Sequence, residues 1–357
     1  MTTLSSKKVF FGCPFDCDEK HEAIQAKLTG RWKPEAIDDP LKPIMDIIRQ
    51  EIPADLWREL PGIEVPDWLR PMPPRSNQPK MVVDEFINFI DQDGCRDMAA
   101  QTDRFVTEHI LPQTPVMVTV DHSLSGGVLK ALTRCYGTEN ITVVVLDSHT
   151  DAMPMSVLAD SIQYDIDNNP NSVYNRHDPF LYHRTDSYNA SSFIHHLLDE
   201  KIILAKNLYI VGVSDYPEKR TLRIKDPRIS RYAGVYTGLR RQGAKVITKK
   251  ECQLSFSKLK FILQRIDTPY LYVSIDMDIG ARNAVEGVRF LNQRGLNEKK
   301  IYRIADALVH VLSNGVQLAG LDINEINPRS AGLEHPSGND RTYRIAANMI
   351  KKIAFLK

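Results

Sequence analysis

Short apolar runs recur along the chain, and longer stretches with a helical period separate them. The runs are rich in Val, Ile and Leu, which is typical of strands buried on both faces. The predicted strands cover residues 9–12, 115–120, 141–147, 207–213, 244–248, 270–276 and 316–324. The predicted helices cover residues 127–136, 191–201, 255–266, 298–312 and 340–355. This alternation predicts an α/β fold with a mostly parallel sheet covered by helices on both faces.

Two segments interrupt the alternation. Residues 34–79 are rich in proline and tryptophan and show no clear period, so we expect an irregular excursion there. Residues 152–188 follow a predicted strand and contain the turn-forming sequence DIDNNPNS, so we expect a second polar loop. The chain of 357 residues is long enough for one large domain or for two smaller ones, and length alone does not decide between them.

Composition narrows the choice of partners. The 46 basic and 45 acidic residues nearly balance, and no polybasic run is present, so nucleic acid is not an expected partner. The N-terminal apolar stretch is too short for a signal peptide, and no window resembles a membrane span. We therefore expect a soluble, cytoplasmic protein without a membrane partner.

The cysteines predict neither a disulfide framework nor a zinc site. They are five in number, and an odd count in a long chain favours reduced surroundings. Cys13 and Cys17 could form a soft-metal pair, but no second Cys/His pair completes it.

The strongest chemical signal is a triplet at the end of a predicted strand. In VVVLDSHTDAMP an apolar run leads directly into Asp147, His149 and Asp151, at a spacing of two. Alternate residues of an extended chain lie on one side, so these side chains would converge at the carboxyl edge of the sheet, where open α/β sheets bind ligands. An ordinary polar loop after a strand would also explain the triplet taken alone.

The same pattern recurs at two other predicted strand ends. VTVDHS places Asp121 and His122 after one strand, and LYVSIDMDIG places Asp276 and Asp278 after another. Carboxylates and imidazoles together suit hard or borderline divalent ions, and a set this large suits two ions better than one. Clustered carboxylates would repel one another without bound cations. The predicted ligands are His122, Asp147, His149, Asp151, Asp276 and Asp278.

At these motifs the chain resembles the ureohydrolase superfamily, which includes arginase, agmatinase and formimidoylglutamase. The blocks VTVDHS (118–123), LDSHTDA (146–152), VSIDMD (273–278) and DINEINP (322–328) follow the family's order, and GCPFD (12–16) is similar to its N-terminal turn. The resemblance implies a single arginase-like domain over residues 1–357, with an insertion at about 34–79. It also implies a three-layer α/β/α fold around an eight-stranded, mostly parallel sheet, and a homo-oligomer.

The resemblance implies roles for individual residues. Asp147 and Asp276 would bridge two Mn²⁺ ions, although Ni²⁺ or Co²⁺ would also suit these ligands. A hydroxide between the metals would be oriented by Asp151 and would attack a guanidinium carbon, releasing an amine and urea. Glu325, in NEINP, would hold the guanidinium by charge-assisted hydrogen bonds. The expected catalytic residues are therefore Asp151 and Glu325.

The sequence departs from the family pattern at the rim of the site. The usual proton-shuttling histidine is replaced within residues 189–193, and His183, His195 and His196 are the possible substitutes. The family's glycine- and proline-rich segment after the third motif becomes IGARNAVEGVRFLNQRGL (279–296).

Two further substitutions concern the substrate. Met153 and Asp160 stand where arginases grip the α-carboxylate of free arginine. We therefore expect a guanidino amine or an arginine-containing peptide, which would give ornithine in the peptide, rather than free arginine. Two other functions stay open: a two-metal phosphoesterase, and a non-catalytic metal-binding relative that acts as a scaffold.

Overall fold

The structure, a computed structural model, describes residues 7–29, 37–291, 294–335 and 338–355. Within these residues eight strands form one sheet, and every strand pair in it is parallel. The spatial order is β2-β1-β3-β8-β7-β4-β5-β6. The strands are β1 (Lys8–Cys13), β2 (Trp57–Glu59), β3 (Thr114–Thr119), β4 (Ile141–Leu146), β5 (Leu208–Val213), β6 (Lys245–Thr248), β7 (Tyr270–Asp276) and β8 (Gln317–Asn324). The predicted parallel α/β sheet is confirmed.

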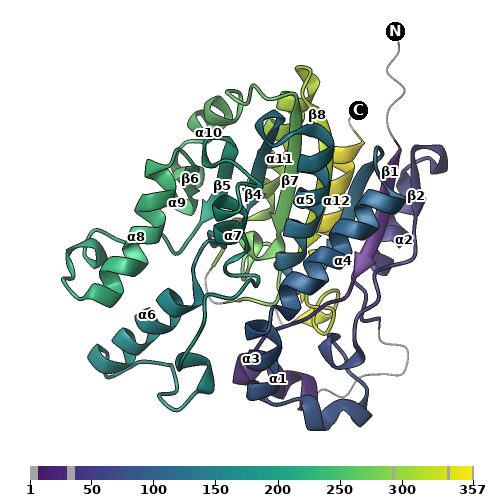
Figure 1. Cartoon of the computed structure of the whole chain (residues 1–357). Helices are drawn as coiled ribbons and strands as arrows, with labels where there is room; N and C mark the ends of the chain where they lie inside the picture. Colours follow the sequence, from purple (N-terminus) through teal and green to yellow (C-terminus); the bar gives the residue numbers. More distant parts are fainter. Residues whose placement is uncertain (1–6, 30–36, 292–293, 336–337, 356–357) are drawn as a thin grey trace.

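Alternate side chains of the strands enter two separate cores. Val143 and Val145 of β4 belong to one apolar cluster, while Val144 and Leu146 belong to the other. Helices cover both faces (Figure 1). Those that contribute buried residues to the first cluster include α3 (Val83–Asp91), α4 (Gly94–His109), α5 (Ser125–Tyr136), α7 (Phe193–Asp199) and α8 (Pro227–Arg241). The second cluster includes residues of α2 (Leu41–Glu51), α9 (Lys249–Leu254), α10 (Phe256–Leu263), α11 (Glu298–Ser313) and α12 (Thr342–Ala354).

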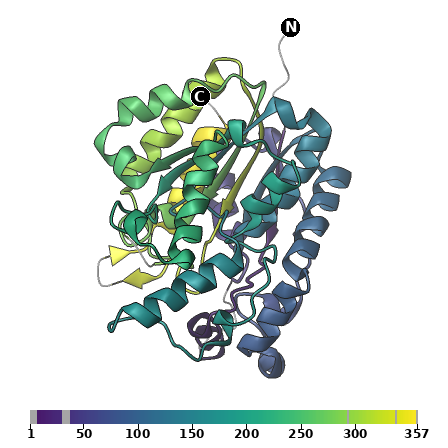
Figure 2. The same ribbon diagram turned by 60° about the vertical axis from the view of Figure 1, so that its left-hand side comes forward.

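Two remaining helices lie near the carboxyl ends of the strands. They are α1 (His21–Thr29) and α6 (Met155–Asn168), and both occupy the lower part of the molecule in Figures 1 and 2. A short antiparallel pair, β9 (Glu334–His335) and β10 (Gly338–Asn339), follows β8. In the described part of the chain, no helix is long and apolar enough to cross a membrane.

Two local predictions were wrong. The segment 152–188 is not simply a loop, because α6 occupies its first half. The excursion at 34–79 contains α2 and the edge strand β2, although its residues 34–36 lie outside the described ones. The helix predicted at 255–266 is confirmed as α10, whereas α9 just before it was not predicted; Ser255 separates the two and caps α10 by accepting from the N–H of Lys258.

Candidate metal centre

The predicted ligands come together at the carboxyl edge of the central strands. His122 follows β3, Asp147 follows β4, Asp276 ends β7, and Glu325 follows β8. These four strands are consecutive in the sheet, in the order β3-β8-β7-β4. Parallel strands that end at one edge deliver the residues after them to one place. The tertiary structure therefore joins motifs that lie about 200 positions apart in the chain.

Two overlapping groups of side chains could each hold a metal ion. In the first, Nδ1 of His122 lies 2.7 Å from Asp151 Oδ2 and 3.5 Å from both Asp147 Oδ2 and Asp276 Oδ2. In the second, Nδ1 of His149 lies 2.9 Å from Asp278 Oδ2 and 3.6 Å from Asp147 Oδ1. Asp147 belongs to both groups, which is the arrangement expected of a bridging carboxylate.

Three of these carboxylates direct one oxygen toward the centre, while the other oxygen accepts a hydrogen bond from a backbone N–H. Asp147 Oδ1 accepts from the N–H of His149 at 2.6 Å, and Asp278 Oδ1 accepts from the N–H of Ser148 at 3.1 Å. Asp276 Oδ1 accepts from the N–H of Asp278 at 2.7 Å. The second oxygens of Asp147 and Asp278 are buried and have no hydrogen-bond partner among the described residues. Buried polar atoms without partners are rare, and here a divalent cation would satisfy them.

Backbone strain marks two of the predicted site residues. Asp151 has φ of 47° and Glu325 has φ of 60°, in the left-handed region that non-glycine residues seldom adopt. Such strain persists where the surrounding structure enforces it, and it concentrates at functional sites. Glu325 directly follows β8, whereas Asp151 lies in the loop after β4, and both carboxylates contact His122.

The electrostatics of the cluster favour a cation. Burial opposes charge on the imidazoles, but the nearby carboxylates outweigh it and raise the pKa of His122 and His149. Burial, together with the charge of Asp147, raises the pKa of Asp151 to about 8. Burial and neighbouring carboxylates also raise the pKa of Asp276. Protons and divalent cations would therefore compete for these groups.

A cavity of about 830 Å³ opens beside this cluster. His149, Asp151, Asp276 and Glu325 reach it from the sheet edge, and residues of α1 and α6 also line it. Glu325 Oε1 accepts from the N–H of His122 at 3.1 Å, whereas Oε2 is buried and lacks a hydrogen-bond partner in the described part of the chain. One oxygen of this carboxylate is thus held in place while the other is left for a ligand.

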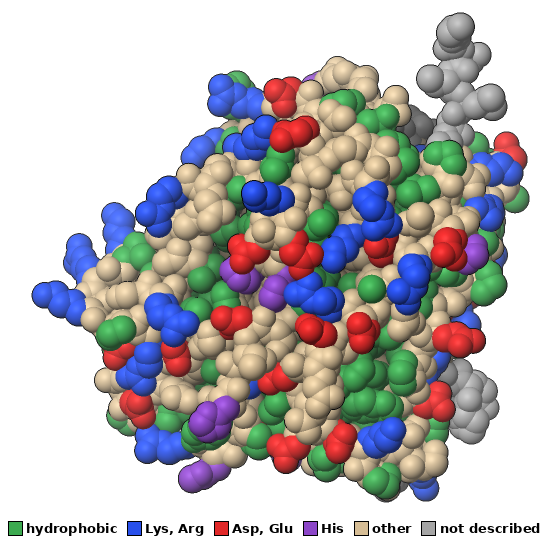
Figure 3. Space-filling view, viewed as in Figure 1, with side chains coloured by type: hydrophobic (Ala, Val, Ile, Leu, Met, Phe, Trp, Pro, Cys, Tyr) green, Lys and Arg blue, Asp and Glu red, His purple; other side chains and the backbone are tan. Residues whose placement is uncertain are grey.

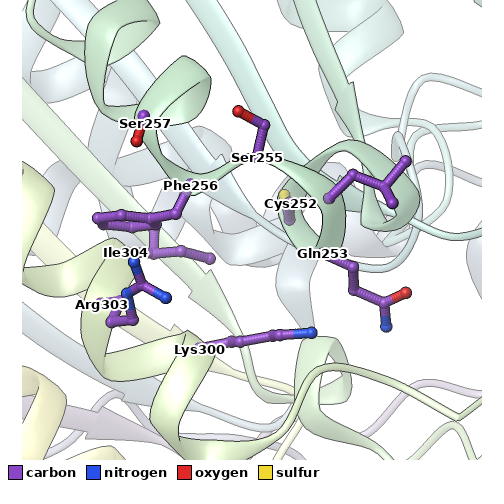
Figure 4. Close-up of a pocket in the computed structure, with 9 residues that line it drawn as sticks. Cys252, Gln253, Ser255, Phe256, Ser257, Lys300, Arg303 and Ile304 are labelled. Atoms are coloured by element: carbon purple, nitrogen blue, oxygen red, sulfur yellow. The ribbon is translucent and has the colours of Figure 1, made fainter.

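A second cavity, of about 300 Å³, lies away from the cluster. It is bounded by α9, α10 and α11, and the guanidinium of Arg303 lies 4.1 Å from the ring centroid of Phe256 (Figure 4). No carboxylate lines it, and none of the predicted ligands reaches it. The candidate metal centre therefore belongs to the larger cavity.

Several rim residues lie elsewhere than predicted. Among the residues lining the larger cavity, none of the three candidate shuttle histidines is present: His183 is exposed, and His195 and His196 lie on α7, where His196 Nδ1 is 3.2 Å from Arg96. Asp160 is not at the mouth, because it forms an ion pair with Arg231 at 2.6 Å. Cys13 and Cys17 are free, and neither belongs to a metal-competent group of the described residues.

Two cavity residues were not predicted. Asp215 follows β5 in NLYIVGVSD, the same strand-end pattern that identified the other acids, and Tyr236 donates to its Oδ2 at 2.7 Å. The strand-end rule could have found it. Arg289 lies in the segment 279–296, of which residues 292 and 293 are outside the described ones, and its guanidinium Nη1 lies 3.1 Å from Glu325 Oε1. No local pattern marks Arg289, because its partners are distant in sequence.

Comparisons with known proteins agree with the observed fold. A model of the Arginase family matches residues 8–356. Among solved structures, proclavaminate amidino hydrolase from Streptomyces clavuligerus is 15% identical, with 98% of this chain and 92% of that chain covered and a TM-score of 0.57. Arginase from Bacillus caldovelox is 15% identical, with 99% of each chain covered and a TM-score of 0.57. Formiminoglutamase from Trypanosoma cruzi, solved with Mn²⁺, is 12% identical, with 98% and 92% covered and a TM-score of 0.56. No curated protein sequence matches the chain.

Proposed function

Because the chain belongs to the arginase family, we propose that it hydrolyses a carbon–nitrogen bond of a guanidino or related amidine group, using two divalent metal ions. The observation that carries the proposal is the position of Glu325. Glu325 lines the same cavity as Asp151 and Asp276, and its Oε2 is buried without a hydrogen-bond partner among the described residues, so one ligand at this end of the cavity would lie beside all three. A carboxylate beside a two-metal site suits a substrate group that donates N–H bonds.

The donor set favours Mn²⁺, since it consists of carboxylate oxygens and imidazole nitrogens without a thiolate. Ni²⁺ and Co²⁺ would also fit. The ligands would be those of the two metal-competent groups: His122, Asp147, His149, Asp151, Asp276 and Asp278. When bound, the metal pair would lower the pKa of a water so that it could attack at neutral pH.

The protein's own residues would position the reactants. Glu325 Oε2 would accept an N–H of the amidine and hold its carbon over the cluster. Asp151, at the rim of the cavity, would accept a hydrogen bond from the attacking water and orient it. The products of guanidino hydrolysis would be an amine and urea.

We infer the part of the substrate that lies beyond the guanidino group from the residues of the cavity wall. Met153 is buried and lines the cavity, so an apolar side chain stands where a free α-carboxylate would need a donor. A guanidino amine, or an arginine within a peptide that would become ornithine, suits this wall better than free arginine. Asp160 no longer supports this inference, because Arg231 neutralises it on the outer surface.

A urea assay with Mn²⁺ tests the proposal against three substrates: agmatine, an N- and C-blocked arginyl peptide, and free arginine. We expect urea from either of the first two at a rate well above that from arginine. Glu325→Gln should lower kcat/KM at least about 100-fold, the cost of roughly 3 kcal/mol of transition-state binding, with two metals still bound. Glu22→Gln, an exposed cavity residue on α1, is the matched control and should keep the wild-type rate.

Metal content is measured in the same samples. A protein that holds two metals but releases no urea or amine from any of these substrates would contradict the proposal and favour the scaffold function. Turnover of a phosphomonoester instead would favour a phosphoesterase.

A further inference from the structure

Glu325, the proposed substrate-binding carboxylate, already contacts a guanidinium of the protein itself. Nη1 of Arg289 donates to Glu325 Oε1 at 3.1 Å and to Asp121 Oδ2 at 3.2 Å. Nε of the same side chain lies 3.4 Å from Asp16 Oδ1. The Arg289 side chain is only 4% exposed, yet it lines the cavity. A resident guanidinium thus sits beside the position where a substrate guanidinium would bind.

Arg289 is held at both its ends. Its backbone N–H donates to the carbonyl of Glu325 at 3.0 Å, and Nη1 also donates to the carbonyl of Val120 at 3.3 Å. Withdrawing the side chain would leave Asp121 and Glu325, both about 99% buried, without this cation. Breaking a buried ion pair on one side is strongly destabilising, so Arg289 would stay in place when a ligand enters.

The charges around Glu325 are balanced without a ligand. Three buried carboxylates and three cations form a continuous set of ion pairs. Lys27 lies 3.1 Å from Asp16, Arg329 lies 3.7 Å from Asp16, and Arg289 contacts all three acids, which are Asp16, Asp121 and Glu325. A guanidinium cation at Glu325 Oε2 would add an uncompensated positive charge next to Arg289, in a site where solvent screening is weak. An uncharged group with N–H donors would not.

We propose that Arg289 is a specificity-determining residue, a resident counter-ion of Glu325 that selects an amidine group able to bind uncharged at mildly alkaline pH, such as an acylguanidine, over a guanidinium cation. The inference rests on the proposed function and narrows its substrate class: among guanidino and related amidine groups, it ranks a neutral one ahead of the cationic guanidino amine and arginyl peptide, which are there compared only with free arginine. Glu325 Oε1 accepts hydrogen bonds from Arg289 and from the backbone N–H of His122, and Oε2 accepts one N–H of the substrate. Two guanidinium groups that share one carboxylate repel each other, and this repulsion sets the preference.

Equilibrium binding of two probes to the Mn²⁺-loaded protein tests the proposal at mildly alkaline pH. Methylguanidine is a cation under these conditions, whereas N-acetylguanidine is largely neutral because its acyl group withdraws electron density. Calorimetry gives both dissociation constants for the wild type, Arg289→Met, Arg289→Lys and Arg329→Met. Arg289→Lys keeps the charge. Arg329→Met removes a cavity cation that contacts Asp16 rather than Glu325.

The wild type should bind N-acetylguanidine at least about tenfold more tightly than methylguanidine. Arg289→Met should tighten methylguanidine binding by about tenfold or more and should not tighten N-acetylguanidine binding, so the preference narrows or reverses. Arg289→Lys and Arg329→Met should keep the wild-type order.

The proposal is overturned if the wild type binds methylguanidine as tightly as N-acetylguanidine, if neither probe binds, or if Arg289→Met shifts both affinities equally. Should Arg289→Met fail to fold, Arg289→Gln, which keeps an N–H for Glu325, replaces it, and the wild-type order alone can still refute the inference. The dissociation constants report binding alone and do not depend on whether the protein hydrolyses a substrate. A wild-type preference for the neutral probe without hydrolysis of any amidine would refute the proposed function alone, and hydrolysis with the opposite preference would refute only the role of Arg289.

Discussion

The hydroxyl of Ser274 lies 2.8 Å from Nε2 of His122, inside the sheet and behind the predicted metal centre. The same hydroxyl donates to Asp322 Oδ1 at 2.5 Å, so its lone pairs are left to accept. His122 therefore donates from Nε2, and the lone pair of Nδ1 is free to bind a cation among the three carboxylates in front of it. Partners of this kind fix the tautomer and orientation of a metal-binding imidazole.

Replacing this partner should weaken metal binding. We expect Ser274→Ala to raise the dissociation constant for Mn²⁺ by about 10- to 100-fold, because the imidazole loses the acceptor that orients it. Calorimetric titration with Mn²⁺ measures the change. Ser161→Ala, which removes a hydroxyl bonded only to the carbonyl of Leu158 within α6, is the control and should bind Mn²⁺ as the wild type does. An unchanged Mn²⁺ affinity in Ser274→Ala would contradict the assignment of His122 as a ligand.

Chelation should make the folded protein sensitive to alkaline pH. The pKa values of His122 and His149 are raised above the ordinary 6.5 by their carboxylate neighbours, and that of Asp151 is raised to about 8, chiefly by burial. With no cation present, the folded protein then binds more protons than the unfolded chain at any pH between the ordinary pKa values of these groups and their raised values in the folded protein. The free energy of unfolding should fall as the pH rises through this range.

Excess Mn²⁺ should remove this loss, because the cations replace the protons. Thermal unfolding with a chelator and with Mn²⁺, at pH near 6.5 and near 8, checks the expectation. At pH near 8, free Mn²⁺ at 100 times its dissociation constant should stabilise the protein by about 2.7 kcal/mol, and the same Mn²⁺ concentration should stabilise it less at pH near 6.5, where protons compete for the ligands. Equal stabilisation at both values would show that the clustered groups do not exchange protons for metal.

Asp16 should be important for stability although it is not a predicted ligand. Burial alone would raise its pKa, but Lys27, Arg289 and Arg329 outweigh burial and lower it to about 2. We expect Asp16→Asn to lower the free energy of unfolding by about 3–5 kcal/mol, since three buried cations lose a shared partner. Asp55→Asn, an exposed acid outside the described ion pairs, should change it by less than about 0.5 kcal/mol.

The pH dependence of this effect has a definite direction. Because the pKa is lower in the folded protein, the contribution of Asp16 is present above the ordinary value of 3.8 and is lost as the pH falls toward about 2. Urea unfolding of the wild type and Asp16→Asn should therefore converge on acidification. A difference independent of pH would argue against the ion pair.

The contact between α4 and α5 should not tolerate a methyl group. A Cβ at Gly127 would lie 2.1 Å from the carbonyl oxygen of Ala99, which is backbone and cannot move aside alone. Gly127→Ala should lower the free energy of unfolding by about 1–3 kcal/mol. Gly234→Ala on α8 meets no atom within 4 Å and should instead stabilise by about 0.5–1 kcal/mol, through its helix propensity. Urea titration measures both, and equal effects would refute the packing argument.

Strand positions could be predicted because a parallel strand buried on both faces leaves a continuous apolar run. All seven predicted strands are present, with no end shifted by more than one residue. The edge strand β2 was missed, since its residues Trp57–Glu59 are half-buried or exposed and carry no such run. Helices α4 and α8 were missed for a related reason: α8, for example, buries only Ile229, Ala233, Tyr236 and Leu239, and charged and small residues interrupt its pattern. On the face shown in Figure 3, basic and acidic side chains are interspersed, as the near-zero net charge suggests.

The sequence by itself determined the strand ends and their acids, because an apolar run that stops at Asp147 or Asp276 places the acid at the sheet edge whatever the strand order. Only the tertiary structure decided which acids lie close enough together to hold one metal ion, since that depends on β3, β8, β7 and β4 being neighbours. It also decided the partner of Glu325. Arg289 is separated from Glu325 by 36 residues and from Asp121 by 168, and such a charge pair leaves no periodic trace in the chain. Local patterns report burial and direction, whereas electrostatic partners are chosen by the packing of distant segments.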